Sequence, residues 1–252
     1  MSAARRRLDV ELVRRGLAPS REQARAAVEA GRVLVGGAPA TKAARLVGAG
    51  EAIRLAGPGP RFVSRGGDKL EAALEHFGVE VAGARVLDAG ASTGGFTDCV
   101  LQRGAAAVVA LDVGYGQLHE RLRADPRVTC VERTNLRHAD LDELGAPFDV
   151  VVADLSFISL TKVADRLVGA CRPGGVVVVL VKPQFEAGRR EADRGRGVIT
   201  DPAVHRRVVD EVGDALGAQG AVIMGVMASP ITGADGNVEF LLAARVGGAG
   251  EG

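Results

Sequence analysis

The chain has 252 residues, of which 47% are hydrophobic and 25% charged, which excludes a disordered protein and allows one large or two smaller domains. Its net charge of +1 hides an asymmetry: residues 1–60 hold 11 Lys and Arg against 5 Asp and Glu, whereas the remainder is mildly acidic. This favours a polyanionic partner for the first segment, although an arginine-rich solvated surface fits the charge alone equally well.

Several kinds of site and location are disfavoured. The cysteines Cys99, Cys130 and Cys171 are far apart and show no metal-like spacing with the four histidines, so we expect no metal site and a reducing, cytoplasmic location. The first residues lack the apolar stretch of a signal peptide. The longest apolar run, 176–181, is far shorter than the roughly 20 residues of a membrane span, so we expect no membrane partner.

The first sixty residues predict a small α+β domain. Residues 7–16 place leucines and a valine on one helical face. A second helix begins at Ser20, whose spacing to Gln23 is that of a capping box. Residues 32–37 and 51–55 alternate like short strands.

Arginines decorate these predicted elements. They are Arg5, Arg6, Arg7, Arg14, Arg15, Arg21, Arg25 and Arg32. The order of a leucine-rich helix, a Ser-Arg-x-x-Ala helix and a Gly-x-Val-x-Val-Gly-Gly turn resembles the S-four RNA-binding domain. The resemblance implies that the basic second helix and the following loop bind RNA, and arginine forks suit phosphate oxygens. The alternative is a purely structural helical cap.

The run Gly57-Pro-Gly-Pro60 breaks regular structure and predicts a domain boundary. We therefore expect a first domain over residues 1–58, a linker over 59–64 and a second domain over 65–252.

The second domain alternates strands with helices. Strands are predicted over 85–88, 107–112, 128–132, 148–154, 175–182, 221–228 and 239–244, and helices over 95–103, 160–171 and 202–216. This order predicts an α/β fold with a Rossmann-like sheet of seven strands. Ligands of such sheets bind at the carboxyl ends of the parallel strands.

The first predicted strand of this sheet runs into the glycine-rich segment LDAGASTGG, residues 87–95. It matches neither a dinucleotide fingerprint nor a phosphate-binding P-loop. Asp88 would repel a pyrophosphate and suits a cationic ligand, and Asp112 is placed to accept ribose hydroxyls. The segment resembles the first motif of S-adenosylmethionine-dependent methyltransferases. The cofactor residues so implied are Asp88, Gly90, Ser92, Thr93, Gly94, Gly95, Phe96, Asp112, Val113, Asn135 and Asp154.

Four further residues stand where a catalytic site would form: Lys69, Asp154, Lys182 and Glu239. A lysine after a strand as apolar as 176–181 is costly to bury unless it is paired, although it could simply reach solvent at the strand end. The set resembles the Lys-Asp-Lys-Glu tetrad of the FtsJ-like rRNA 2′-O-methyltransferases. The similarity extends over residues 62–246.

With the S-four-like segment in front, the whole chain resembles the TlyA family, also called hemolysin A. The blocks SRGGDKL, DVGYGQL, DLSFISL, VKPQFEAGR and NVEF occur in that family's order. The resemblance implies methyl transfer from S-adenosylmethionine to cytidine 2′-hydroxyls of 16S and/or 23S rRNA, within 30S and/or 50S subunits. Arg65 and Arg189 join the implied RNA-binding set.

By the same resemblance, Lys182 is the base or polariser of the 2′-hydroxyl, Asp154 orients Lys182 or the methyl donor, and Glu239 holds Lys69 or the ribose. Pure positioning, with water taking the proton, stays open. Tyr115 and Phe157 could flank the adenine or the target base, although core packing is the favoured role for Phe157. The competing hypotheses are a membrane-active protein and a non-catalytic RNA-binding factor. We expect a monomer, because RNA should supply the large interface.

Overall fold

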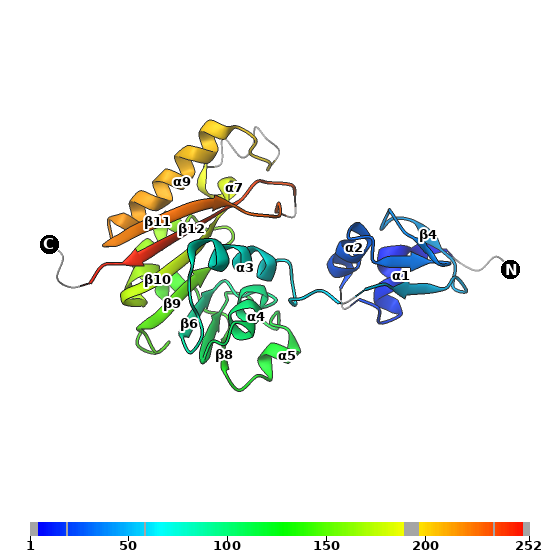
Figure 1. Cartoon of the computed structure of the whole chain (residues 1–252), viewed down its shortest axis with the longest axis horizontal. Helices are drawn as coiled ribbons and strands as arrows, with labels where there is room; N and C mark the ends of the chain where they lie inside the picture. Colours follow the sequence, from blue (N-terminus) through cyan, green and yellow to red (C-terminus); the bar gives the residue numbers. More distant parts are fainter. Residues whose placement is uncertain (1–4, 19, 58, 189–196, 234, 249–252) are drawn as a thin grey trace. The chain divides into compact units, whose positions relative to one another are not determined.

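The computed structural model describes residues 5–18, 20–57, 59–188, 197–233 and 235–248. It divides between Arg61 and Phe62 into two compact units (Figure 1). The predicted linker boundary differs from this division, because Phe62 and Val63 are buried in the core of the second unit. The backbone N–H of Val63 donates to Asp98 Oδ2 at 2.9 Å, which ties the segment to that unit.

The smaller unit has two helices and short strands. In chain order they are β1 (Arg6–Arg7), α1 (Leu8–Arg14), α2 (Arg21–Glu29), β2 (Val33–Val35), β3 (Ala38–Pro39), β4 (Leu46–Val47) and β5 (Ile53–Leu55). Strands β3, β2 and β5 form one sheet, and β1 pairs with β4. Ser20 caps α2 by accepting from the N–H of Gln23, as the sequence predicted. The apolar faces of both helices and of β2 meet in one core.

The larger unit is an α/β sandwich. Its elements are α3 (Gly66–Phe77), β6 (Arg85–Ala89), α4 (Gly95–Gln102), β7 (Ala107–Leu111), α5 (Glu120–Arg123), β8 (Val128–Val131), η1 (Leu136–His138), β9 (Phe148–Ala153), η2 (Leu160–Lys162), α6 (Ala164–Gly169), β10 (Cys171–Val181), α7 (Pro183–Glu186), α9 (Pro202–Gly217), β11 (Ala221–Ala228) and β12 (Phe240–Val246). The seven strands lie in the order β11-β12-β10-β9-β6-β7-β8. Neighbours from β10 to β8 are parallel, whereas β12 is antiparallel to both β10 and β11.

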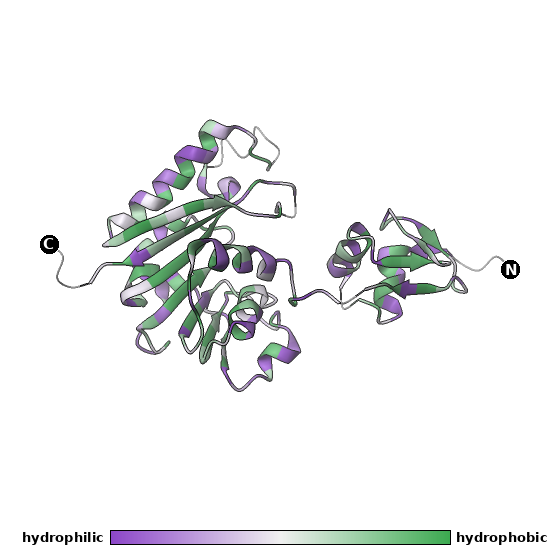
Figure 2. Cartoon of the chain, viewed as in Figure 1, coloured by the Kyte–Doolittle hydropathy of each residue, from purple (hydrophilic) through white to green (hydrophobic). Residues whose placement is uncertain are grey.

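Helices cover both faces of this sheet. Alternate residues of β10 point to opposite sides: Val177 and Val179 join the core beneath α6 and α9, whereas Val178 and Leu180 join the core beneath α3 and α4. Burial on both faces explains why the strand reads as one continuous apolar run. Figure 2 shows the strands of the large sheet as mainly hydrophobic, while α3 and α9 also carry hydrophilic stretches. The predicted fold class is confirmed.

Candidate active site

The carboxyl edge of the parallel strands gathers the charged residues that the sequence singled out. Asp88 lies in β6, Asp112 follows β7, Asp154 follows β9 and Lys182 follows β10. Because β7, β6, β9 and β10 are neighbours in that order, their carboxyl ends share one edge of the sheet. This is the edge at which ligands bind in folds of this kind.

The glycine-rich loop lies close to the neighbouring strand end. Gly90 has a φ of +88°, and a Cβ there would come within 2.5 Å of the backbone oxygen of Asp154. Only glycine accommodates both conditions. A Cβ on Gly95 would lie 2.3 Å from Ser64 Oγ, so this glycine lets α4 begin against the segment leading into α3.

The other predicted cofactor residues are spread around this loop. Ser92 and Thr93 are exposed, as are Val113 and Asn135, and the Asn135 side chain accepts from the N–H of Arg137 at the start of η1. Gly94 adopts a φ of +96° next to leucine side chains of the α5 region, and Phe96 is buried in the core. In this structure Gly94 and Phe96 therefore serve packing, whereas the exposed residues are accessible to a ligand.

Asp112 is held by the backbone of two loops. Its Oδ2 accepts from the N–H of Ser92 at 2.8 Å, and its Oδ1 accepts from the N–H of Gly114 at 2.6 Å. Each carboxylate oxygen has a further lone pair, so both can still accept a ribose hydroxyl. A small pocket beside Asp112 is lined by Ser92, Gln117 and Glu132 among others.

Asp88 is fully buried. Thr97 Oγ1 donates to its Oδ2 at 2.6 Å, whereas Oδ1 has no hydrogen-bond partner among the described residues. Burial raises the pKa of this carboxyl to about 7 against the opposing Thr97 hydrogen bond, and the carboxylates of Asp154 and Asp112 add to the rise. A buried acceptor without a partner, beside two further carboxylates, fits a ligand that carries positive charge and N–H donors. S-adenosylmethionine has both.

The four residues of the predicted tetrad form two ion pairs. Lys69 Nζ lies 2.5 Å from Glu239 Oε2, and Lys182 Nζ lies 2.5 Å from Asp154 Oδ1. Both lysine side chains are nearly buried, with 11% and 12% exposed. Val181 at the end of β10 pairs with Phe240 at the start of β12. Lys182 follows Val181 and Glu239 precedes Phe240, so the strand register brings the two ion pairs together.

Two side chains in this region were not predicted from the sequence. Ser156 Oγ accepts from Lys182 Nζ at 3.0 Å. Glu186 Oε1 accepts from the N–H of Leu160 at 2.9 Å and its Oε2 from Ser159 Oγ at 2.6 Å, which ties the loop after β9 to α7. Burial raises the pKa of the Glu186 carboxyl. The proximity of Ser156 to Asp154 in sequence could have suggested the first contact, but nothing local indicates the second.

The expectation for Phe157 was wrong. Its side chain is 92% exposed, and its φ of +65° is uncommon for an aromatic residue. The ring lies 5.2 Å from that of Phe185, whose ring centroid is 5.8 Å from Lys182 Nζ. An apolar, exposed ring is thus presented beside the catalytic candidates, where a planar ligand could stack on it.

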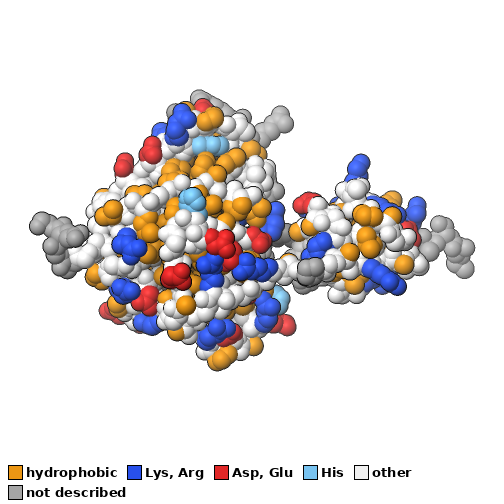
Figure 3. Space-filling model, in the orientation of Figure 1, with side chains coloured by type: hydrophobic (Ala, Val, Ile, Leu, Met, Phe, Trp, Pro, Cys, Tyr) orange, Lys and Arg blue, Asp and Glu red, His pale blue; other side chains and the backbone are white. Residues whose placement is uncertain are grey.

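The predicted RNA-binding arginines are mostly organised by acids. Asp9 and Glu11 pair with Arg6, Arg7, Arg14, Arg15, Arg21 and Arg25. Arg5 pairs with Glu51, and Arg32 donates to the backbone oxygen of Ala56. Figure 3 shows Lys and Arg side chains at several places on the surface of the smaller unit. Arg65 precedes α3, and Arg189 lies outside the described residues.

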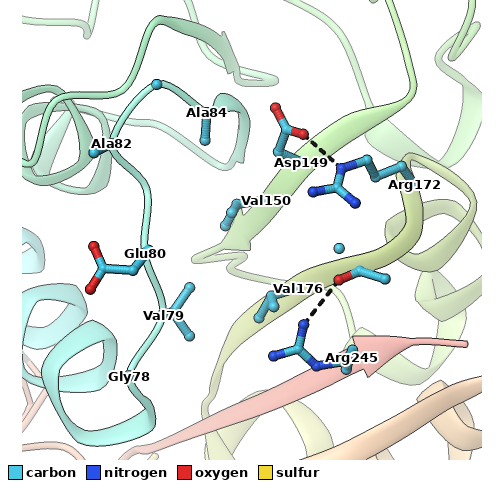
Figure 4. A pocket seen from close by; sticks show the side chains of 13 residues that line it. Gly78, Val79, Glu80, Ala82, Ala84, Asp149, Val150, Arg172, Val176 and Arg245 are labelled. Atoms are coloured by element: carbon cyan, nitrogen blue, oxygen red, sulfur yellow. Dashed lines mark hydrogen bonds and ion pairs between the residues drawn. The ribbon is translucent and has the colours of Figure 1, made fainter.

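A larger cavity lies at the opposite edge of the sheet. Its volume is about 370 Å³, and its lining residues lie near the amino ends of β6 and β9 and in β10 and β12. Figure 4 shows Arg172 turned toward Asp149, which it binds at 2.7 Å, while Arg245 donates to the backbone oxygen of Gly174. No predicted site residue lines it, so it is not the candidate active site.

The sheet order, the glycine loop after β6 and the acids at the strand ends define a methyltransferase of the Rossmann-like class. No described helix is long and apolar enough to cross a membrane, and no cluster of three metal-ligating side chains occurs within the described ranges.

Comparisons with known proteins specify the family. The FtsJ-like methyltransferase model matches residues 62–246, and the S4 domain model matches residues 6–53. The chain is 51% identical to the 16S/23S rRNA (cytidine-2′-O)-methyltransferase TlyA of Mycobacterium tuberculosis, over 95% of this chain and 90% of that one. It is 34% identical to the 23S rRNA (cytidine-2′-O)-methyltransferase TlyA of Campylobacter jejuni, over 71% and 69%.

A solved Streptococcus thermophilus structure, provisionally described as a hemolysin, is also similar. It shares 39% identity and a TM-score of 0.77, over 98% of this chain and 90% of that one. The chain belongs to the FtsJ-like methyltransferase family, in the branch that carries an amino-terminal S4 domain and is named TlyA or hemolysin A.

Proposed function

We propose that the protein transfers a methyl group from S-adenosylmethionine to the ribose 2′-hydroxyl of cytidine in 16S and 23S rRNA, acting on 30S and 50S subunits in the cytoplasm. The observation that carries this proposal is the meeting of two lysine–carboxylate pairs beside the glycine-rich loop. The names of the Mycobacterium and Campylobacter relatives support the rRNA substrate, and the first is the more similar of the two.

The cofactor supplies an electrophilic methyl group on a sulfonium sulfur. Asp112 would hold its ribose through carboxylate oxygens that are already fixed by two backbone N–H groups. Asp88 would offer its unpaired Oδ1 to the positively charged part of the molecule. Gly90 keeps the loop backbone close to the end of β9, where a side chain would otherwise intrude.

Lys182 is the residue that acts on the hydroxyl. Its ammonium group forms an ion pair with Asp154 and donates one hydrogen bond to Ser156 Oγ, and an ammonium has three N–H donors. A further donor can bind the 2′-oxygen and stabilise negative charge as it develops there. An ion-paired ammonium has no free lone pair, so in this arrangement Lys182 polarises the hydroxyl and water takes the proton. Lys69 and Glu239 hold the neighbouring start of β12 to α3.

The test is transfer of radiolabelled methyl to 30S and 50S subunits that lack the modification. Lys182→Ala should lower the rate by at least about 100-fold, the scale of one positioned polar group in a transition state. Lys162→Ala, an exposed lysine of η2, is the matched control and should leave the rate unchanged.

Three outcomes are informative. Label on both subunits, lost in Lys182→Ala, supports the proposal, whereas label on 50S alone restricts the substrate to 23S rRNA. Absence of label on either subunit, together with tight RNA binding, would replace the enzyme by a binding factor.

A further inference from the structure

The first turn of α1 contains two acids that are buried in a strongly basic domain. Asp9 is 0% exposed and Glu11 is 1% exposed. Carboxylates are seldom fully buried unless cations or hydrogen bonds compensate for the lost hydration. In this domain the compensation comes from arginines, three for each acid.

Asp9 gathers arginines from two elements. Arg7 of β1 donates to both carboxylate oxygens at 3.0 Å. Arg21 and Arg25, one turn apart on α2, donate to Oδ2 at 3.0 Å and 3.4 Å. One buried carboxylate therefore fixes the separation of guanidinium groups on β1 and α2.

Glu11 organises a second group on the other side of α1. Arg14 donates from two nitrogens at 2.6 Å and 2.8 Å, and Arg15 donates from Nε at 2.8 Å. Arg6 lies 3.9 Å away. Arg15 also donates to the backbone oxygens of Gly48, Ala49 and Glu51, so this group is tied to the turn before β5.

Each acid accepts hydrogen bonds from only some of the N–H donors of its arginine partners. The side chains of Arg6, Arg7, Arg14, Arg21 and Arg25 remain 44–52% exposed. A guanidinium has five N–H donors, so a group that binds a buried carboxylate keeps others directed to solvent. Six cations around two anions also leave the cluster positive. Its long side chains are ordered in advance, which removes a cost that flexible arginines would meet on binding.

We propose that Asp9 and Glu11 are positioning residues for RNA binding: they fix an arginine array whose outward donors bind successive phosphates of the RNA backbone. The proposal rests on the proposed function, in that rRNA is the ligand. It has an unusual consequence, because neutralising either acid makes the domain more positive and yet should weaken binding. An unordered positive surface would behave in the opposite way.

The experiment measures binding of the full-length chain to purified, unmodified 16S and 23S rRNA between 50 and 200 mM salt. Asp9→Asn and Glu11→Gln keep the shape of each side chain and remove its charge. Each should weaken binding by at least about tenfold, the cost of ordering three side chains anew, and should flatten the salt dependence. Glu29→Gln is the control, because this exposed acid at the end of α2 makes no ion pair with the described arginines. It should leave affinity unchanged or slightly increased.

A double-mutant cycle separates positioning from general folding. With Arg7, Arg21 and Arg25 all replaced by Gln, Asp9→Asn should have no further effect on affinity. A tenfold loss that persists in this background would show that Asp9 only supports the fold and would overturn the proposal. Equal or tighter binding by Asp9→Asn and Glu11→Gln, relative to Glu29→Gln, would overturn it as well.

Failure of the proposed function gives a different pattern. Suppose that the wild-type chain binds rRNA and the two acid variants lose this binding, but that no methyl group is transferred. The proposal for the arginine array then stands and the enzyme assignment fails. If methyl transfer by the variants is normal in both kcat and KM, the enzyme assignment stands and the array fails. A wild-type chain that binds neither rRNA refutes the array.

Discussion

Binding of S-adenosylmethionine should depend on pH through Asp88. Burial brings the pKa of this carboxyl to about 7. A group with that pKa is about one tenth ionised at pH 6 and about nine tenths ionised at pH 8. If the cationic cofactor binds the ionised form, its apparent Kd at pH 6 should be about tenfold that at pH 8. At pH 7, binding should release about half a proton per site.

Isothermal titration calorimetry of the full-length protein tests this, with S-adenosylmethionine as ligand at several pH values and in buffers of different ionisation enthalpy. Asp88→Asn should bind more weakly at pH 8 and show no pH dependence. Asp165→Asn, which changes an exposed acid of α6, should behave like the wild type. S-adenosylhomocysteine lacks the sulfonium charge, so a weaker pH dependence with this ligand would identify the sulfonium as the group that Asp88 senses.

Two results would refute the reasoning. One is a wild-type affinity that stays constant between pH 6 and pH 8. The other is a pH dependence that persists in Asp88→Asn, because the titrating group would then be another residue.

Three further predictions concern stability. Glu239→Gln leaves Lys69 buried without its counter-charge and should lower the free energy of unfolding by about 3–5 kcal/mol, seen as a large fall in Tm. Replacing both residues by Leu and Met should recover most of that loss. A loss below about 1 kcal/mol for the single change would contradict the buried pair. Gly90→Ala places a Cβ 2.5 Å from a backbone oxygen at a residue of positive φ. Denaturant unfolding should therefore show a larger loss of stability than the roughly 1 kcal/mol expected for Gly78→Ala, where φ is also positive but the space around the Cβ is open. Equal losses of stability in the two variants would argue against the close approach. Hydrogen bonds from Arg14 and then Arg15 lower the pKa of the Glu11 carboxyl to about 2, so its contribution to stability is complete above about pH 4.5 and is lost as the pH falls toward 2. The protection factors for hydrogen exchange over residues 5–57, taken relative to the unfolded chain at the same pH, should fall across that range, and constant protection factors would refute this.

The sequence by itself determined the order of the elements and the identity of the chemical groups. Apolar segments that alternate with predicted helices indicated the strands of the large sheet, and the glycine-rich segment after β6 predicted the position of the cofactor loop. These are local signals, because side-chain period and turn chemistry depend on neighbours along the chain. Resemblance to a family then supplied the tetrad, which local patterns alone could not select from the other charged residues.

Only the tertiary structure decided which groups meet. Lys69 and Glu239 are 170 residues apart, and their pairing depends on how α3 packs beside β12. Packing also exposed Phe157, which local hydrophobicity had assigned to the core, and moved Phe62 and Val63 out of the linker. Partners distant in sequence are chosen by strand register and by the fit of packed faces, and neither is encoded in a single local pattern.

The smaller domain shows the same division most clearly. Its sequence reveals a run of arginines and a few acids, which any solvated basic surface would share. Folding packs arginine side chains over Asp9 and Glu11, which shields both carboxylates from water, and thereby converts a composition into a fixed arrangement of charges. Burial creates that arrangement, because a carboxylate removed from water must take its hydrogen bonds from the protein groups that surround it.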